Sequence, residues 1–93
     1  MERFDPAQAI DRHAAAILRV LVARWPRRLD QIDIETWTEE IPEPATREKF
    51  PVSRRTIGRR LRLLAAAELA DRGQGGWTVT PRGREILALF DAA

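Results

Sequence analysis

The sequence predicts a single, mainly α-helical domain that carries one small β-hairpin. Its 93 residues are enough for one hydrophobic core but not for two. Apolar residues recur at the three- and four-residue spacing of amphipathic helices, and helix-start signals precede them. Near the C-terminal end, three glycines in four residues separate two short alternating segments, which is typical of a β-hairpin with a flexible tip.

The first helix is expected over residues 6–25. Asp5 is a preferred N-cap, Pro6 is favoured at the first helical position, and Gln8 completes a capping box. Pro26 ends the helix because it disfavours the helical conformation in the residue before it. The inner apolar stripe consists of Ile10, Ala14, Ile17 and Leu21. The apolar surface extends beyond this stripe through Leu18, Val20 and Val22. Either a second subunit covers this surplus, or the helix is central and is enclosed by its own domain.

A short second helix is expected near residues 34–41, with a tryptophan as its core anchor. Its apolar residues follow helical spacing: Ile34, Trp37 and Ile41. Thr36 and Glu39 could start it as a capping box, or Asp33 could cap an earlier start. Prolines end this helix, and residues 45–50 beyond them form one further candidate turn of helix.

The third helix is the most informative segment, and it is expected over residues 53–68 with Ser53 as its N-cap. At 100° per residue, one narrow apolar stripe contains Ile57, Leu61 and Leu64. Almost opposite lie three arginines at i, i+4 and i+7: Arg55, Arg59 and Arg62. A guanidinium group fits phosphate oxygens or the O6/N7 edge of guanine, so this face suits nucleic acid. The alternative is a solvated cationic face.

A hairpin and a last helix complete the predicted domain. Strands are expected at residues 69–72 and 77–80, with Trp77 and Val79 on the core face. Thr80 followed by proline repeats the cap-then-proline start of a helix. The apolar residues of this final helix are Ile86, Leu87, Leu89 and Phe90.

Charge is segregated along the chain, although the total is only +2. Residues 30–48 include seven acidic side chains and one basic side chain, a net charge of −6. Residues 52–84 include eight basic and two acidic side chains, a net charge of +6. This asymmetry indicates one side that faces a polyanion and one side that is turned away from it.

The composition argues against several other classes of function. Without cysteine, the chain has no disulfide, thiolate nucleophile or cysteine metal site. No apolar run approaches the roughly 20 residues that span a bilayer, so a cytoplasmic protein is expected. The only histidine, His13, is expected at the edge of an apolar stripe rather than in a metal site. No residue set supports nucleophilic, metal or acid–base catalysis, so we expect neither an enzyme nor a cofactor.

The order helix, helix, basic helix, glycine-tipped hairpin, helix resembles a winged helix-turn-helix domain. Residues 52–57, followed by Leu61 and Leu64, look like the turn and recognition helix of winged bacterial repressors. Residues 68–70 resemble the exit into the first wing strand, and residues 79–85 are similar to the wing-to-helix junction of MarR-like and PadR-like regulators. The resemblance implies a single winged-helix domain over residues 1–93, with a recognition helix at about 53–68, a wing at about 69–80 and a C-terminal helix at about 81–91.

The resemblance also implies that the partner is double-stranded DNA. Residues of the recognition helix would enter or flank the major groove: Ser53, Arg54, Arg55, Thr56, Arg59 and Arg62. Arg72 and the tip, residues 73–76, would lie along the minor groove or the phosphates. Arg55 and Arg59 then become the candidates for reading bases. The phosphate contacts would come from Ser53, Arg54, Arg62, Arg72 and Arg82.

One segment departs from the family pattern. The turn before a recognition helix usually has three or four residues, but eleven residues with three prolines follow residues 34–41. Either residues 45–50 are the true second helix, or the loop is an insertion. Its acids Glu43 and Glu48 would repel phosphate, so they are expected to point away from DNA.

Two functions are consistent with these observations. The first is sequence-specific DNA binding by a small transcriptional regulator, which we expect to be a homodimer because one inserted helix covers only a few base pairs. The dimer surface would come from surplus apolar residues of the first and last helices: Leu18, Val20, Val22, Leu87, Leu89 and Phe90. The alternative is a protein–protein interaction module of a larger assembly, with the acidic segment 30–48 as its docking surface.

Overall fold

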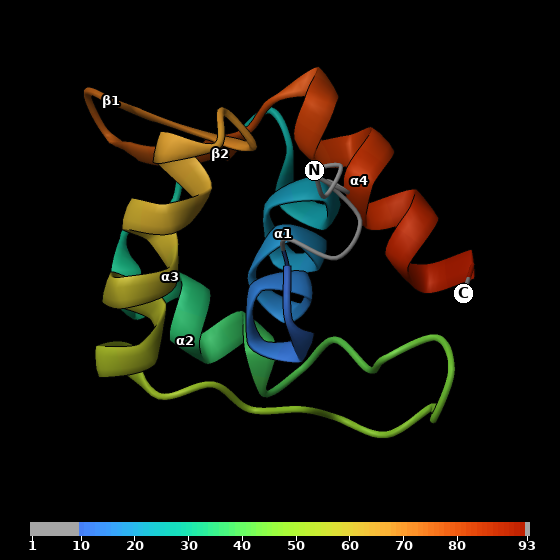
Figure 1. Ribbon diagram of the computed structural model, residues 1–93. Coiled ribbons are helices and arrows are strands. Elements are labelled where there is room, and N and C mark those ends of the chain that lie inside the picture. The colour runs from blue at the N-terminus through green and yellow to red at the C-terminus, as the bar shows by residue number, and fades with distance from the viewer. Residues whose placement is uncertain (1–9, 93) are drawn as a thin grey trace.

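The computed structural model describes residues 10–92, which form four helices and one antiparallel hairpin. The elements follow one another as α1 (Arg12–Arg24), α2 (Gln31–Thr38), α3 (Arg54–Ala66), β1 (Ala70–Gly73), β2 (Gly76–Val79) and α4 (Pro81–Ala92). The predicted fold class, mainly α with one small hairpin, is confirmed. The hairpin follows three helices and precedes the fourth, which is compatible with a winged-helix layout (Figure 1).

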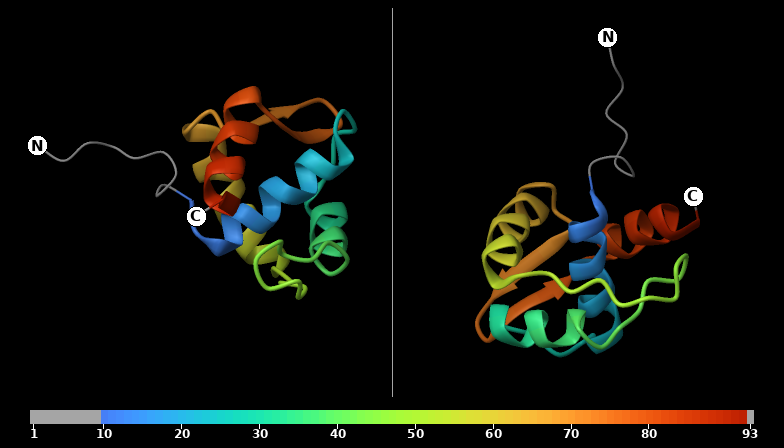
Figure 2. Two further views of the ribbon diagram at one scale, coloured as in Figure 1. Left: turned by 90° about the vertical axis from the view of Figure 1, so that its right-hand side faces the viewer. Right: turned by 90° about the horizontal axis from the view of Figure 1, so that it is seen from below.

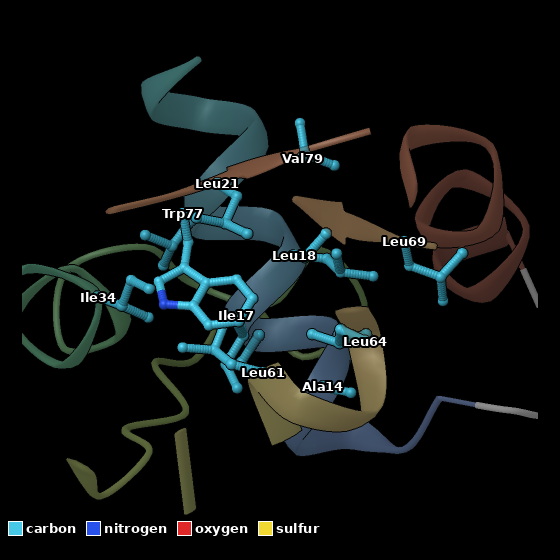
Figure 3. Close-up of a cluster of buried hydrophobic side chains, with 14 of the residues drawn as sticks. Ala14, Ile17, Leu18, Leu21, Ile34, Leu61, Leu64, Leu69, Trp77 and Val79 are labelled. Atoms are coloured by element: carbon cyan, nitrogen blue, oxygen red, sulfur yellow. The ribbon is translucent and has the colours of Figure 1, made fainter. Parts of the chain in front are cut away.

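Helix α1 is the centre of the core. It contacts α2, α3, α4 and β2, and α3 and α4 lie on opposite sides of it (Figure 1). Figure 3 shows its side chains among those of α2, α3 and the hairpin. Leu18 and Val20 are 0% and 1% exposed. Leu18 and Val20 are therefore enclosed by their own domain and offer no surface to a second subunit. Val22, the third residue of the surplus, is partly buried against the same core.

The start of α1 differs from the predicted one. Ile10 and Asp11 are not helical, and the helix begins at Arg12 instead of residue 6. Asp11 is the N-cap, because its carboxylate accepts a hydrogen bond from the Ala14 N–H at 2.8 Å. The signals at Asp5, Pro6 and Gln8 lie outside the described residues.

Helix α2 begins and ends three residues earlier than predicted. Asp30 is its N-cap and accepts a hydrogen bond from the Asp33 N–H at 2.8 Å. Neither predicted start is correct, since Asp33 and Thr36 both lie inside the helix. Trp37 is half-buried and packs against the core, as expected. Residues 45–50 are not helical, so the alternative second helix is wrong.

The fifteen residues between α2 and α3, residues 39–53, form an excursion that we call the arm. A single β-bridge joins Pro42 and Lys49 across it, and Glu43 inside it is buried. The arm runs away from α3 toward the C-terminal end of α4 (Figure 2). Fifteen residues thus connect α2 and α3, where the resemblance to a winged helix-turn-helix domain predicts a turn of three or four.

The hairpin matches its predicted position within about one residue. Ala70 pairs with Val79 and Gly73 pairs with Gly76, which leaves a two-residue turn. Trp77 is buried, and its backbone exchanges two hydrogen bonds with Leu29 at 2.8 and 2.9 Å. Gly76 is required here because its φ is +121° and an added Cβ would lie 2.5 Å from the Leu29 carbonyl oxygen. The segment before α2 therefore fixes the hairpin against the domain.

Helix α4 starts as predicted, at Pro81 after Thr80. The Thr80 hydroxyl accepts a hydrogen bond from the Gly83 N–H at 3.0 Å. Gly83 is buried, and an added Cβ would lie 2.1 Å from the carbonyl oxygen of Leu69. This close approach packs the first turn of α4 directly against Leu69, the residue that precedes β1. None of the helices in residues 10–92 is long and apolar enough to cross a membrane.

Candidate nucleic-acid interface

Helix α3 has one face in the core and one face in solvent. Ser53 is its N-cap, with its hydroxyl oxygen 3.3 Å from the Thr56 N–H donor and 3.1 Å from the Thr56 hydroxyl. The apolar stripe is fully buried: Ile57, Leu61 and Leu64. Burial of three large side chains along one stripe fixes the rotation of the helix, and therefore fixes which residues face outward.

The outward face presents the three predicted arginines. Arg55, Arg59 and Arg62 are all exposed. Within residues 10–92 their guanidinium groups make no ion pair or side-chain hydrogen bond, so their donors remain available. At a rise of about 1.5 Å per residue, the row spans about 10 Å along the helix axis, which is comparable to three base-pair steps.

Arg54 differs from these three because it already has an anionic partner. The carboxylate of Glu35, on α2, accepts a hydrogen bond from the Arg54 guanidinium at 3.1 Å. Its other oxygen accepts one from the Arg54 backbone N–H at 2.8 Å. The expectation that Arg54 is a free phosphate ligand is therefore not met in this conformation.

Arg60 lies on the same helix but turns toward α1. Its guanidinium donates to the Asp11 carboxylate at 2.9 and 2.6 Å. This pairing raises the pKa of Arg60. Burial pushes the pKa of Asp11 upward, but hydrogen bonds from Arg60 and from the Ala14 N–H outweigh it, so the pKa of Asp11 is lowered. Arg60 thus joins α3 to the cap of α1 and does not belong to the exposed row.

The hairpin carries the second part of the candidate interface. Arg72 on β1 is exposed, with its guanidinium 5.9 Å from the centre of the Trp77 ring. Arg28 stabilises the hairpin by donating to the Asp71 carboxylate at 2.8 Å and to the Gly76 carbonyl oxygen at 3.2 Å. The sequence did not single out Arg28, since its partners are more than forty positions away. The hairpin is therefore held at both strands.

Arg82 completes the set of predicted residues. It is exposed on the first turn of α4, directly after β2, and makes no ion pair within the described residues. Its neighbour Arg84 instead lies over the Trp25 ring at 4.9 Å. Five of the eight predicted site residues are thus exposed arginines whose donors are not engaged in ion pairs in residues 10–92: Arg55, Arg59, Arg62, Arg72 and Arg82.

The acidic side chains of segment 30–48 differ in their surroundings. Asp30 caps α2, Glu35 pairs with Arg54, and Glu43 is buried against Arg12. Glu43 points into the protein, toward Arg12 of α1. The other four acids of the segment, Asp33, Glu39, Glu40 and Glu48, make no ion pair within the described residues.

Two hollows of the surface are not lined by the arginine row. One, of about 330 Å³, lies between the start of α1 and the last turns of α3, and includes Asp11 and Arg60. The other, of about 350 Å³, lies between the arm, α1 and the end of α4. His13 packs against Phe50 with ring centres 5.1 Å apart. No group of three or more histidine, aspartate or glutamate side chains in residues 10–92 is placed to hold a metal ion.

Comparison of the chain with models of protein families, with curated proteins and with solved structures finds no match. The likeness to winged-helix regulators therefore depends on the residues of α3, the hairpin and the start of α4, together with the order of the elements.

Proposed function

We propose that this protein binds double-stranded DNA in a sequence-specific manner and acts as a small transcriptional regulator. The observation that carries the proposal is the row Arg55, Arg59 and Arg62. These side chains are exposed and unpaired among the described residues, on a helix whose opposite face is locked in the core. An α-helix fits the major groove, and arginine is the residue most often used there for specific contacts to guanine.

The proposal assigns different tasks to different residues. Arg55 and Arg59 read base edges, because they lie in the first half of α3, the end of a recognition helix that enters the groove. Phosphate contacts come from residues around them: Ser53, Thr56, Arg62, Arg72 and Arg82. The hairpin then acts as a wing beside the recognition helix.

A titration against random duplex DNA tests the proposal. A random duplex offers Arg55 and Arg59 no preferred bases, so on it we expect all five unpaired arginines to lie against phosphates. The plot of log K against log salt then has a slope of roughly −4 to −5, at about −0.9 per phosphate. Fluorescence anisotropy of a labelled duplex between low and moderate salt measures this slope. A flat salt dependence, or no binding at low salt, would rule out DNA binding.

The alternative is a protein–protein interaction module. Its support is the group of exposed acids that lack an ion pair in residues 10–92, Glu39, Glu40 and Glu48, together with the partly buried Asp33. The same titration separates the two functions, since a docking module whose arginines are only solvated binds random DNA weakly or not at all.

A further inference from the structure

The pairing of Glu35 with Arg54 places a carboxylate at the end of the arginine helix. The Glu35 and Arg54 side chains are 28% and 55% exposed, so the pair lies at the surface. Arg54 is the first residue of α3, and its backbone N–H has no partner within the helix. One carboxylate therefore occupies both the guanidinium and a free N–H at the positive end of the helix dipole.

We propose that Glu35 takes the place of a DNA phosphate at Arg54 and thereby lowers the affinity of the protein for DNA. This inference rests on the proposed function. A carboxylate and a phosphate compete for the same guanidinium donors, and two anions cannot share them without repulsion. Arg54 is adjacent to Arg55 in the exposed row, so a phosphate that approaches this end of α3 must first displace Glu35. Glu35 is thus a positioning residue that withholds one arginine from the interface.

We expect Glu35→Gln to fold, because contacts that do not involve the charge of Glu35 also hold α2 against the arm and against α3. The Thr38 hydroxyl accepts a hydrogen bond from the Val52 N–H at 3.1 Å, and both residues are buried. The Gln31 side chain lies over Gly58, 3.3 Å from the position of an added Cβ. A glutamine at position 35 also retains an oxygen that can accept from the Arg54 N–H. Glu35→Gln is therefore a suitable test.

The experiment compares variants for binding to a labelled random duplex. Glu35→Gln releases the Arg54 guanidinium, so we expect about five- to tenfold tighter binding near 0.1 M salt and a salt slope steeper by about 0.9, the value of one phosphate. Glu40→Gln is the matched control. It removes the same charge from the same region, but the Glu40 side chain makes no hydrogen bond or ion pair to α3. Its effect should stay below about twofold, the size expected of a screened surface charge.

Arg54→Ala completes a double-mutant cycle. In the native protein, Arg54→Ala should change the affinity for DNA less than about twofold, because Glu35 already pairs with Arg54. In the Glu35→Gln variant, Arg54→Ala should abolish the gain in affinity that Glu35→Gln produces. A loss of about fivefold or more on Arg54→Ala alone would overturn the inference even if Glu35→Gln failed to fold. Equal gains for Glu35→Gln and Glu40→Gln, or a gain that persists without Arg54, would overturn it as well.

The failure of this inference is distinguishable from the failure of the proposed function. If the native protein binds DNA with the expected salt slope but Glu35→Gln binds no tighter, only the role of Glu35 is wrong. If neither binds at low salt, the proposed function is wrong and this inference with it.

Discussion

The guanidinium of Arg12 donates two hydrogen bonds to the carboxylate of Glu43, at 2.7 and 2.5 Å, across 31 positions of the chain. Glu43 is only 6% exposed and also accepts a hydrogen bond from the Thr46 hydroxyl at 3.1 Å. Arg12 in turn lies over the Phe50 ring at 4.1 Å. These contacts attach the arm to the first turn of α1.

The first prediction concerns the pH dependence of this attachment. The hydrogen bonds from Arg12 outweigh the effect of burial and lower the pKa of Glu43. A carboxyl group whose pKa is lower in the folded state stabilises the protein above its unfolded pKa, about 4.3, and this contribution is lost as the pH falls through the folded value. We therefore expect Glu43→Gln to reduce the free energy of unfolding by about 1–3 kcal/mol at pH 7.

Urea unfolding at several pH values measures this difference. The gap between the native protein and Glu43→Gln should close as the pH falls below about 4.3. Glu48→Gln is the control, because Glu48 lies in the same arm but is exposed and makes no ion pair in the described residues. A gap that stays constant down to low pH would mean that the charge of Glu43 does not stabilise the fold.

The parts of the fold that sequence predicted well are those with strong local signals. Ser53 begins α3 because its hydroxyl caps a free N–H of the next turn, and Thr80 with Pro81 begins α4 in the same way. Gly75 and Gly76 both have positive φ, so the turn of the hairpin could hardly form elsewhere. In each case one or two neighbouring residues decide the structure.

The starts of α1 and α2 were mispredicted because several capping residues compete there. Asp11 has the same capping chemistry as Asp5, and it is also held by Arg60, 49 positions away. Asp30, Asp33 and Thr36 are all suitable N-caps, and Asp30 is the one that caps α2. The β-bridge between Leu29 and Trp77 places the chain for a start at Asp30. Such long-range contacts are not visible in local sequence.

The candidate site also has a part that local sequence identifies and a part that depends on long-range contacts. Helical periodicity alone identifies Arg55, Arg59 and Arg62 as one exposed face once the apolar stripe is known. It cannot identify the partner of Arg54, because Glu35 is 19 positions away on another helix. Only the packing of α2 against α3 brings the two together.

The second prediction tests the close packing of α4. In Gly83→Ala, the new methyl group would lie 2.1 Å from the Leu69 carbonyl oxygen and 2.9 Å from a methyl carbon of Val79. Because the first contact is with backbone, α4 must shift, and we expect a loss of about 2–3 kcal/mol in stability. Thermal unfolding measures it, with the exposed Arg82→Ala as a control that should change stability by less than about 0.5 kcal/mol. Similar melting of both variants would show that α4 has room at this contact.

The third prediction separates base reading from phosphate binding. On a site selected from a random DNA pool, Arg55→Ala and Arg59→Ala should each cost about 1–3 kcal/mol of binding free energy, and much less on random DNA. Arg72→Ala, in the hairpin, should weaken binding to both about equally, since a phosphate contact is independent of sequence. Arg47→Ala is the charge-matched control, because Arg47 is exposed on the arm, which runs away from α3 (Figure 2). If Arg55→Ala, Arg59→Ala and Arg72→Ala lose the same binding free energy on every sequence, α3 positions the protein but does not read bases.

The last prediction is that the protein is a homodimer, paired through the exposed end of α4. The buried Leu18, Val20 and Leu87 cannot form this surface. Among the large apolar side chains of α4, Leu89 is the exposed one, at 57%, whereas Phe90 is partly buried against the core.

Because α4 lies on the other side of α1 from α3, pairing through Leu89 leaves both arginine rows free (Figure 1). A two-fold dimer would then match a palindromic site whose half-sites lie about one helical turn apart, roughly 34–36 Å. Sedimentation at micromolar concentration should show a dimer for the native protein and a monomer for Leu89→Glu, because the new carboxylate would be buried without a partner. Leu63→Glu is the matched control, since Leu63 is 62% exposed on α3 and its substitution should leave the dimer intact. If the native protein sediments as a monomer both free and on DNA, the dimer is excluded and the docking-module alternative gains support.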